Sequence, residues 1–576
     1  MSAIEEGSEG LLKSQGTLPA TAQGEGLQAP PTPGGEAEPA RSGLPAETAV
    51  ETRQAGAQIA RAAAIIMAAF IVSNLVGFVQ TLVISRAFGT SAQLDSFNAA
   101  NRVTELLFNL MAGGALGSAF IPLFTGLLTR GERKRAWELA SGVLNVLLAV
   151  LIVVTVLIYI FAPWLVQHGL FLLVPNSDPV QLELTVRLLR IMLPTVVIFG
   201  VSGLLMGMLN SHQSFLIPAI APILYSGGII FGTLALPTTL GIDRVAYGVL
   251  IGASAHLLVQ LPAIWRLPQR AYTRTAGLRD KLVRQVLTLM VPRLIGAGVV
   301  QLNFVANTVI ALSLGEGAAS AVALAFTLML MPQRTIAQSA GIASLPTLSA
   351  QAELGEFAAM RKTLSDILRV IMLLALPSTV GLILIRQVLV QVLYQRGAFT
   401  AHSTEMVAWA LLWYAIGLVG HSLVEVLSRA FYALHDTRTP VMVSVGAMAL
   451  NIGLSFAFAS LFARLGWMSL GGLALANSVA TTLESLVLLI LLRTRMRGIG
   501  GSRVWNASLI GLLGSALMGA GVWAWLNFAT GNSQVVLLLG ALVIGVGLYA
   551  GLMLLLKVPE AHALVNKIKA RVVARR

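Results

Sequence analysis

The chain has 576 residues, of which 56% are hydrophobic, 11% are charged and none is cysteine. A soluble domain carries about 25% charged residues, so this composition predicts a membrane protein, and the absence of cysteine excludes disulfides, cysteine-ligated metals and thiol nucleophiles. The formal net charge of +14 then indicates membrane topology rather than nucleic-acid binding.

Residues 1–55 differ in composition from the rest of the chain. They contain six prolines and eight acidic residues, and they hold no apolar run that could form a signal-peptide core. A segment with so little apolar surface to bury predicts a disordered tail.

Long apolar runs begin at Ala62, and they predict an all-α polytopic membrane protein with about fourteen transmembrane helices of roughly 20 residues or more. The expected spans are 62–88, 94–128, 136–166, 184–210, 215–237, 245–266, 284–314, 317–349, 363–394, 404–434, 440–463, 469–492, 504–528 and 534–556. We expect four further divisions, which are an N-lobe of six spans (56–270), a C-lobe of six (271–497), an appendage of two (498–560) and a basic cytoplasmic tail (561–576).

The segments that connect these spans alternate in charge. One alternating set is basic, and the segments of the other set hold at most one Lys or Arg each. The basic segments are 130–135, 266–281, 361–362, 493–503 and 567–576. Because basic segments remain in the cytoplasm, we expect both termini to be cytoplasmic.

An internal repeat joins the two predicted lobes. Pro122 aligns with Pro346, and 346 − 122 = 224; the Gly-Glu pairs at 131–132 and 355–356 have the same offset. A unit of six spans keeps its orientation when it is duplicated, so the repeat is parallel and predicts two lobes that face a central cavity, as in alternating-access transporters. Shared hydrophobic composition is the alternative explanation.

Ionisable side chains inside the spans are candidates for a substrate path, because they are costly in lipid. Arg102 and Glu105 lie three residues apart, so they share a helical face and can pair. Arg293 and Arg334 have no acid within a helical turn. They suggest a cavity that accepts an anion, since a guanidinium can bond two phosphate oxygens. Snorkelling, or a partner on a distant helix, is the alternative.

His421 and Glu425 share a face of the tenth span, as either a proton relay or an interhelical contact. No further His, Asp or Glu cluster in the sequence completes a metal site, and the chain contains no Gly-Lys dipeptide and hence no phosphate loop. We therefore expect no cofactor and no metal, and movement that is passive or driven by an ion gradient or the membrane potential.

Several strings resemble the MurJ (MviN) family of lipid II flippases, within the multidrug/oligosaccharidyl-lipid/polysaccharide exporter superfamily. The strings are F-G-T-S-A-Q-L-D-S-F at 88–97, A-G-G-A-L-G-S-A-F-I-P at 112–122, G-M-L-N-S-H at 207–212, Y-Q-R-G-A-F-T at 394–400 and R-A-F-Y-A-L-H-D-T-R-T-P at 429–440. The resemblance covers residues 60–560 and agrees with fourteen spans.

The resemblance places Asp95 on the family's acidic position and Arg102 on a basic one. Asn74 and Gln80 stand where the family has two cavity arginines, Thr104 to Asn109 replace its Pro-Asn-Leu-Leu-Arg-Arg string, and Thr327 replaces an arginine of the eighth helix. We expect Asp95, Arg102, Arg293 and Arg334 to bind a substrate head group, with Asn74, Gln80 and Asn109 as neutral hydrogen-bond donors.

The resemblance implies a flippase, not an enzyme, that moves lipid II outward by alternating access for cell-wall synthesis. Its expected partners are a lipid-linked saccharide, membrane lipid and the cell-wall synthesis machinery, and no nucleic acid. The alternative is a flippase for another polyprenyl-diphosphate-linked glycan, which the missing arginines favour. The R-G-A-F-T and D-T-R-T-P strings oppose it, so we expect lipid II as the substrate, in a bacterial inner membrane. A drug exporter would need acids at depth, and a polytopic glycosyltransferase or lipid phosphatase would need carboxylate or His clusters in outward loops.

Overall fold

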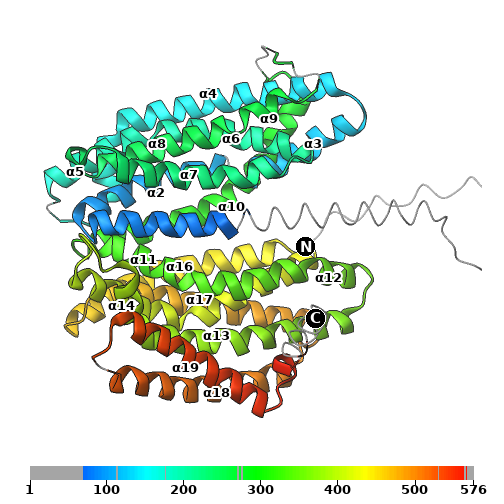
Figure 1. Cartoon of the computed structure of the whole chain (residues 1–576). Helices are drawn as coiled ribbons and strands as arrows, with labels where there is room; N and C mark the ends of the chain where they lie inside the picture. Colours follow the sequence, from blue (N-terminus) through cyan, green and yellow to red (C-terminus); the bar gives the residue numbers. More distant parts are fainter. Residues whose placement is uncertain are drawn as a thin grey trace, which may run out of the picture. The chain divides into compact units, whose positions relative to one another are not determined.

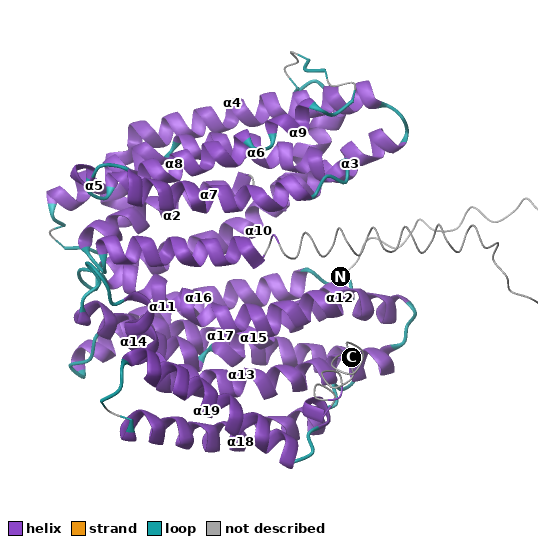
Figure 2. Cartoon of the chain, in the orientation of Figure 1, coloured by secondary structure: helices purple, strands orange, loops and turns teal. Residues whose placement is uncertain are grey.

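The computed structural model describes residues 69, 71–111, 114–175, 177–268, 271–273, 277–529, 531–562 and 566, so the predicted tail at 1–55 lies outside the described residues. Within these ranges the chain is helical and contains no β-strand (Figure 2). The all-α architecture that the composition predicts is confirmed.

The first half of the described chain begins with a helix at Ile71–Phe88. The helices that follow are α2 (Ala92–Met111), α3 (Gly114–Thr129), α4 (Arg133–Leu165), α5 (Pro179–Met192), α6 (Pro194–Ser211), α7 (Leu216–Ala235), α8 (Asp243–Leu258) and α9 (Leu261–Trp265). A π-helical turn, η1 (Val166–Leu170), extends α4, and a 3-10 turn, η2 (Thr238–Leu240), precedes α8.

The second half follows the same order of long helices (Figure 1). Its elements are α10 (Lys281–Leu312), α11 (Ala318–Gln333), the π-helical turn η3 (Arg334–Gln338), α12 (Ser339–Glu353), α13 (Phe357–Tyr394), α14 (Ala401–Ile416), α15 (Leu418–Ala433), α16 (Arg438–Arg464), α17 (Leu470–Arg495), α18 (Gly501–Phe528) and α19 (Gln534–Leu555).

Membrane-spanning character is clear for most of these helices. Eleven of the described helices are long and apolar enough to cross a membrane, and α14 with α15, bent by 49° at their junction, makes up to twelve. Helices also occupy the second and seventh predicted spans, but there only the shorter segments Ala119–Thr129 and Ala297–Leu312 are strongly apolar. The count of fourteen spans therefore stays a prediction for these two, whose hydropathy is lowered by residues such as Glu105 and Arg293.

Helices α7 and α8 pack closely through glycines. Gly228 and Gly232 of α7 lie directly against Gly252 and Gly248 of α8, so that a Cβ at any of the four positions would overlap backbone atoms of the other helix. Small residues four apart allow this approach in membrane helices. The pair forms one wall of the first pocket described below.

Helices α18 and α19 pack on α13, which lies beside them in Figure 1. The Tyr549 hydroxyl of α19 donates to the Leu373 carbonyl of α13 at 2.5 Å. Arg369 of α13 also pairs with Glu560, just beyond α19, at 2.9 Å. The last two predicted spans are thus attached through a single helix of the second half.

The first helix of each predicted lobe also contacts the other half. Phe78 packs edge-on against Tyr394 of α13 with ring centroids 6.5 Å apart, and the Arg86 carbonyl accepts from the Ala398 amide at 2.9 Å. Similarly, α10 packs against α2 and α3 of the first half as well as α16 of the second. These helices connect the two halves, and α10 also lines the second pocket described below.

Candidate functional site

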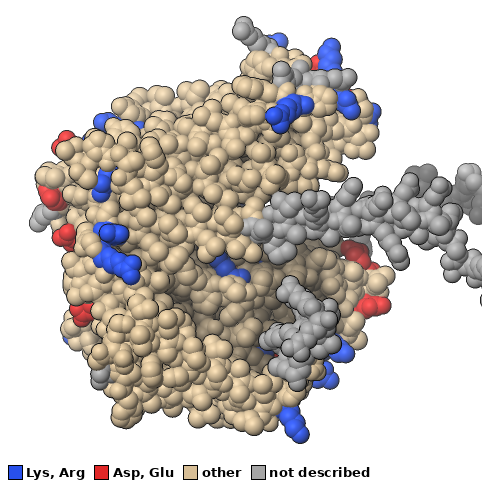
Figure 3. Space-filling model, in the orientation of Figure 1, with Lys and Arg blue, Asp and Glu red and all other residues tan. Residues whose placement is uncertain are grey.

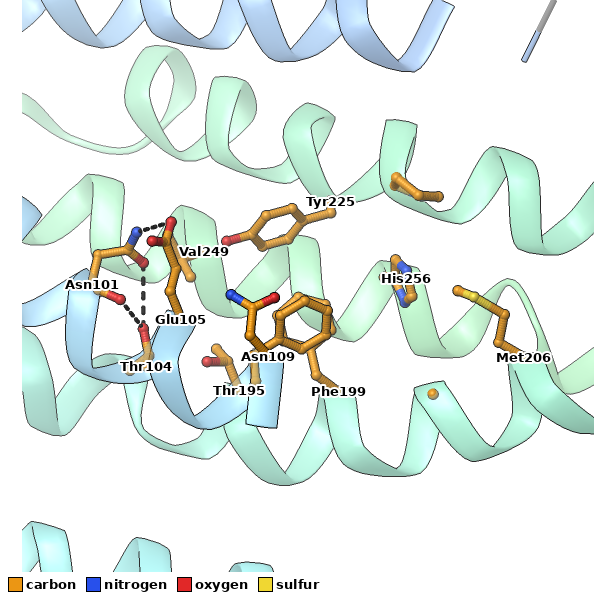
Figure 4. Close-up of a pocket in the computed structure, with 13 residues that line it drawn as sticks. Asn101, Thr104, Glu105, Asn109, Thr195, Phe199, Met206, Tyr225, Val249 and His256 are labelled. Carbon is orange, nitrogen blue, oxygen red and sulfur yellow. Dashed lines mark hydrogen bonds between the residues drawn. The ribbon is translucent and has the colours of Figure 1, made fainter. Parts of the chain in front are cut away.

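Two pockets adjoin at Glu105, which lines both. The first pocket, about 500 Å³, lies among α2, α6, α7 and α8 (Figure 4). Its lining residues are Asn101, Thr104, Glu105, Phe108, Asn109, Thr195, Phe199, Gly203, Met206, Pro222, Tyr225, Val249 and His256. Every one of these residues belongs to the first half.

The second pocket, about 360 Å³, is formed by both halves. Its lining residues are Arg102, Glu105, Asn303, Phe304, Asn307, Thr308, Ala311, Ala319, Val322, Ala323, Phe326, Thr327, Arg334, Tyr414 and Asn477. They come from α2, α10, α11, η3, α14 and α17. Figure 3 shows a hollow on one face of the molecule, with a basic side chain visible inside it.

Arg102 and Glu105 form the ion pair that their spacing predicts. Arg102 Nη1 donates to Glu105 Oε2 at 2.7 Å, and Asn101 Nδ2 donates to Glu105 Oε1 at 3.0 Å. The Arg102 guanidinium also lies 5.3 Å from the centre of the Phe304 ring, within cation–π range. Glu105 faces both pockets, whereas Arg102 faces only the second.

Arg334 opens the π-helical turn η3, between α11 and α12, and its exposed side chain lines the second pocket. Such turns inside longer helices often mark functional sites, because the extra residue re-aims the side chains around it. No carboxylate pairs with Arg334 in the part of the chain that the structure describes. Two of the predicted cations, Arg102 and Arg334, therefore share one pocket.

Amide side chains complete the second pocket. Asn307 Nδ2 donates to Asn451 Oδ1 at 3.0 Å and to Asn303 Oδ1 at 3.1 Å. Asn477 Oδ1 lies 2.9 Å from His421 Nε2, so His421 takes part in an interhelical contact and Glu425 pairs with Arg429 at 2.6 Å instead. The pocket is rich in hydrogen-bonding groups around its two cations.

Of the remaining predicted site residues, only Asn109 lines one of the two pockets. Asn109 lines the first pocket. Arg293 is exposed on α10, Asn74 is exposed and Gln80 is half-buried on the first helix, and these three line neither pocket. Their predicted roles in binding are taken up below as proposals.

Asp95 is buried, 1% exposed, and lies outside both pockets. Its carboxylate accepts from the Gly317 amide at 2.6 Å, the Ser320 amide at 2.7 Å and the Ser320 hydroxyl at 2.6 Å. Because the first amides of a helix lack intrahelical acceptors, Asp95 of α2 acts as the N-terminal cap of α11. It ties the two halves together.

Three residues of the first pocket escaped the sequence analysis. The rings of Phe199 and Tyr225 meet edge-on at 5.1 Å, and Phe199 meets His256 at 5.4 Å. His256 Nδ1 is held 2.6 Å from the buried Ser202 hydroxyl. A lone His and scattered aromatics on apolar helices have no sequence pattern that separates them from core residues, since the contacts that unite them are all tertiary.

The two pockets can bind an anion beside a neutral polar group. The second offers guanidinium groups for anion oxygens, and the first offers rings, amides and hydroxyls. No group of three or more His, Asp or Glu residues that could hold a metal ion occurs within the described ranges. The arrangement is that of a binding cavity between two sets of membrane helices.

Comparisons with known proteins agree with one another. A family model described as "Lipid II flippase MurJ" matches residues 84–544. The lipid II flippase MurJ of Burkholderia cenocepacia is 34% identical over 472 residues, which cover 80% of this chain and 88% of that protein. A probable lipid II flippase MurJ of Rhizobium tropici is 30% identical over 460 residues, which cover 78% of this chain and 83% of that protein.

Solved structures show the same fold. A lipid II flippase MurJ in an inward closed conformation superposes with a TM-score of 0.72 at 24% identity, covering 84% of this chain and 97% of that chain. An inward-facing multidrug resistance MATE family transporter of the MOP superfamily gives a TM-score of 0.61 at 16% identity, covering 74% and 94%. Both likenesses concern the arrangement of helices.

Proposed function

This chain belongs to the lipid II flippase MurJ family, and from that membership we propose that it moves lipid II from the cytoplasmic to the outer face of a bacterial inner membrane. It is a transporter of the MOP superfamily fold with a lipid-linked saccharide as its substrate. We propose further that it catalyses no covalent reaction and that it works beside the cell-wall synthesis machinery, which consumes lipid II at the outer face.

The observation that carries the proposal is the second pocket. Arg102 and Arg334, from different halves, line one cavity of about 360 Å³ together with three asparagines. A diphosphate carries several acceptor oxygens, and guanidinium groups bind such oxygens in pairs. The diphosphate would occupy this pocket while the polyprenyl tail remains in lipid, because burying a long apolar chain in a polar cavity would be unfavourable.

Alternating access supplies the movement. The two halves would rock about the pockets, as two similar repeats commonly do around a central site. The contact between Asp95 and α11 joins two helices that line the second pocket, and it would have to break in the opposite state. Asn74, Gln80 and Arg293 lie outside the pockets in this state, and we propose that they meet the head group as it enters or leaves.

Charge supports an orientation. The basic segment 130–135 follows α3, whereas Asp95 lies at the beginning of α2, so that the α2–α3 span separates them. By the positive-inside rule the basic segment faces the cytoplasm. Asp95 then lies near the outer face, both termini are cytoplasmic, and transport runs from the basic end toward the Asp95 end.

The test is depletion of the protein in its native host, with lipid II measured separately on each face of the membrane. We expect lipid II to accumulate on the inner face and the cells to lyse, with rescue by the wild-type gene but not by Arg102→Ala. Normal lipid II turnover with loss of a surface polysaccharide would instead identify another polyprenyl-diphosphate-linked glycan as the substrate and would overturn the proposal.

A further inference from the structure

Glu105 lies at the boundary between the two pockets and lines both. One carboxylate oxygen, Oε2, accepts from Arg102 on the side of the second pocket, and the other, Oε1, accepts from Asn101. The Glu105 side chain is 43% exposed and that of Arg102 is 27% exposed. The pair is therefore reachable from the cavity and can be exchanged without unfolding α2.

Arg102 has more donors than partners. Its Nη1 is bonded to Glu105, while its Nε is buried and has no hydrogen-bond partner among the residues that the structure describes. Glu105 therefore occupies the anion-binding position of Arg102 from within the protein. An anion that enters the second pocket competes with Glu105 for Arg102, because both offer the same kind of oxygen acceptor.

The first pocket is lined mainly by apolar surface with a few polar groups among it, which suits a neutral ligand that both packs and hydrogen-bonds. Phe108, Phe199 and Tyr225 supply aromatic rings, with Phe108 and Phe199 only 4.7 Å apart between centroids. Asn109 of α2 and Thr195 of α6 supply polar atoms. In Figure 4 the Tyr225 hydroxyl points toward Glu105, and Asn109 lies between Glu105 and Phe199.

Such a lining matches a saccharide. Sugar rings combine apolar C–H faces, which pack on aromatic rings, with hydroxyl and acetamido groups, which need hydrogen-bond partners. The volume of about 500 Å³ falls in the range of pockets that bury whole small ligands. Glu105 is the carboxylate nearest this lining, and once released from Arg102 it can only accept hydrogen bonds.

We propose that the first pocket is the saccharide subsite of the cavity and that Glu105 determines specificity by exchanging partners. With the cavity empty, Glu105 holds Arg102. When the diphosphate takes Arg102, Glu105 turns to the first pocket and accepts N–H or O–H groups from the saccharide. This inference rests on the proposed function, because it assumes a substrate in which a diphosphate is joined to a sugar.

The exchange discriminates between a complete substrate and a polyprenyl diphosphate without sugar. The bare diphosphate must break the Arg102–Glu105 pair and leaves the carboxylate without a donor to replace the arginine, a loss that weakens binding. The complete substrate supplies the replacement donors itself. Discrimination of this kind comes from a penalty on the wrong ligand as well as contacts with the right one.

The experiment measures binding of lipid II and of sugar-free polyprenyl diphosphate to the purified full chain in nanodiscs. Glu105→Gln keeps the shape of the side chain and removes its charge, so Arg102 becomes free for a diphosphate. We expect this variant to bind the sugar-free diphosphate more tightly and lipid II more weakly, so that the ratio of the two affinities falls about tenfold. Asn109→Leu should weaken lipid II binding alone.

Glu138→Gln is the matched control. Glu138 forms the same type of pair with Arg135, three residues earlier in α4, at 3.1 Å, and it lines neither pocket. Its variant should leave both affinities unchanged. Melting temperatures of all variants exclude misfolding as the cause of any loss.

The outcomes separate the two proposals. If the wild-type chain fails to bind lipid II, the proposed function is wrong. If the wild type binds lipid II but Glu105→Gln shifts both affinities in the same direction and by the same factor, the partner exchange is wrong while the function stands. Unchanged lipid II binding by Asn109→Leu would show that the saccharide does not bind in the first pocket.

Discussion

Asp95 on α2 and Ser320 on α11 form a short polar contact between the two halves. One carboxylate oxygen, Oδ1, accepts both the backbone amide of Ser320 at 2.7 Å and its hydroxyl at 2.6 Å. The other, Oδ2, accepts the Gly317 amide at 2.6 Å. Gly317 has φ +78° and lies so close to Thr90 that a Cβ would overlap the Thr90 carbonyl, so the cap depends on glycine at this position.

Asp95→Asn should weaken this closure. Both Asp95 oxygens accept hydrogen bonds, whereas an asparagine has only one oxygen, so its NH₂ group would face an N–H or O–H donor. Each hydrogen bond to a charged acceptor is worth about 1.5–3 kcal/mol. A loss of about 2 kcal/mol shifts a two-state equilibrium roughly thirtyfold. Because the chain has no cysteine, Ala323→Cys in the second pocket is a single reporter for a membrane-impermeant thiol reagent.

We expect Asp95→Asn to raise the labelling rate of that reporter from the outer face and to reduce transport. Asp243→Asn is the control, since Asp243 pairs with Arg187 of the same half at 3.0 Å and should leave the labelling rate unchanged. Equal labelling in wild type and Asp95→Asn would show that the Asp95 contact does not control access to the pocket.

Arg334→Ala should reduce lipid II transport in proteoliposomes by about tenfold, the usual effect of losing a charge-assisted hydrogen bond. The protein should still fold, because the Arg334 side chain is exposed and faces the second pocket. Arg334→Lys should give an intermediate rate, since lysine keeps the charge but cannot bind two oxygens with a planar fork. Arg464→Ala, an exposed arginine outside both pockets, is the control; transport by Arg334→Ala equal to that of the control would remove Arg334 from the site.

Arg293→Ala should have a smaller and salt-dependent effect. Arg293 lines neither pocket in this state, so its attraction for a head group acts through solvent. We expect about a threefold loss of transport rate at low ionic strength, which disappears near 1 M salt where the screening length is about 3 Å. A loss as large as that of Arg334→Ala, persisting in high salt, would instead indicate direct contact.

Apolar runs in the sequence predicted where the helices lie, because a bilayer allows few alternatives to a helix. They did not predict the π-helical turns at 166–170 and 334–338 or the bend after Ile416. These features depend on which neighbouring helix packs against the turn, and that information is absent from hydropathy. Hydropathy also did not predict that the helix at Ile71–Phe88 and α10 each contact both halves, because these contacts too depend on the neighbouring helices.

The site was predicted in part. The spacing of Arg102 and Glu105 identified a pair correctly, since positions three apart on a helix are neighbours on one face. Arg293 was expected to serve the same cavity as Arg334. It lies 10 residues before the pocket residue Asn303 on α10, which is about 15 Å along the helix axis, so its role in binding stays a prediction. The position of a residue within a predicted span indicates its distance from the membrane surface. The position of the pocket along the same axis depends on how the neighbouring helices pack, which the sequence does not show.

The D-T-R-T-P string at 436–440 has a structural role at the start of α16. The amide of Thr439 and then its hydroxyl donate to the Asp436 carboxylate, and with the nearby Arg495 they lower the pKa of this carboxyl group below its ordinary value. A carboxyl group whose pKa is lower in the folded state stabilises the protein at pH values above its pKa in the unfolded state. This stabilisation is lost as the pH falls through its pKa in the folded state. Asp436→Asn should therefore reduce the melting temperature at pH 7.

The difference in melting temperature between wild type and Asp436→Asn should shrink below about pH 4, the ordinary range of an aspartate. Glu353→Gln is the control at the same end of the molecule, because the contact of Glu353 with His435 is largely exposed and such pairs contribute little. A difference that stays constant from pH 7 to acid conditions would show that Asp436 acts without its charge.

Gly252→Ala should destabilise the protein and impair transport together. A Cβ at position 252 would overlap the carbonyl oxygen of Tyr225 on α7, and overpacking of this kind typically costs about 1–3 kcal/mol. Relief requires α7 to move away from α8, which carries the Tyr225 ring out of the wall of the first pocket. Gly227→Ala is the matched control, because a Cβ there meets nothing within 4 Å. We expect a lower melting temperature and slower lipid II transport for Gly252→Ala but wild-type values for Gly227→Ala; a fall in melting temperature with normal transport would mean that the position of Tyr225 does not matter to the substrate.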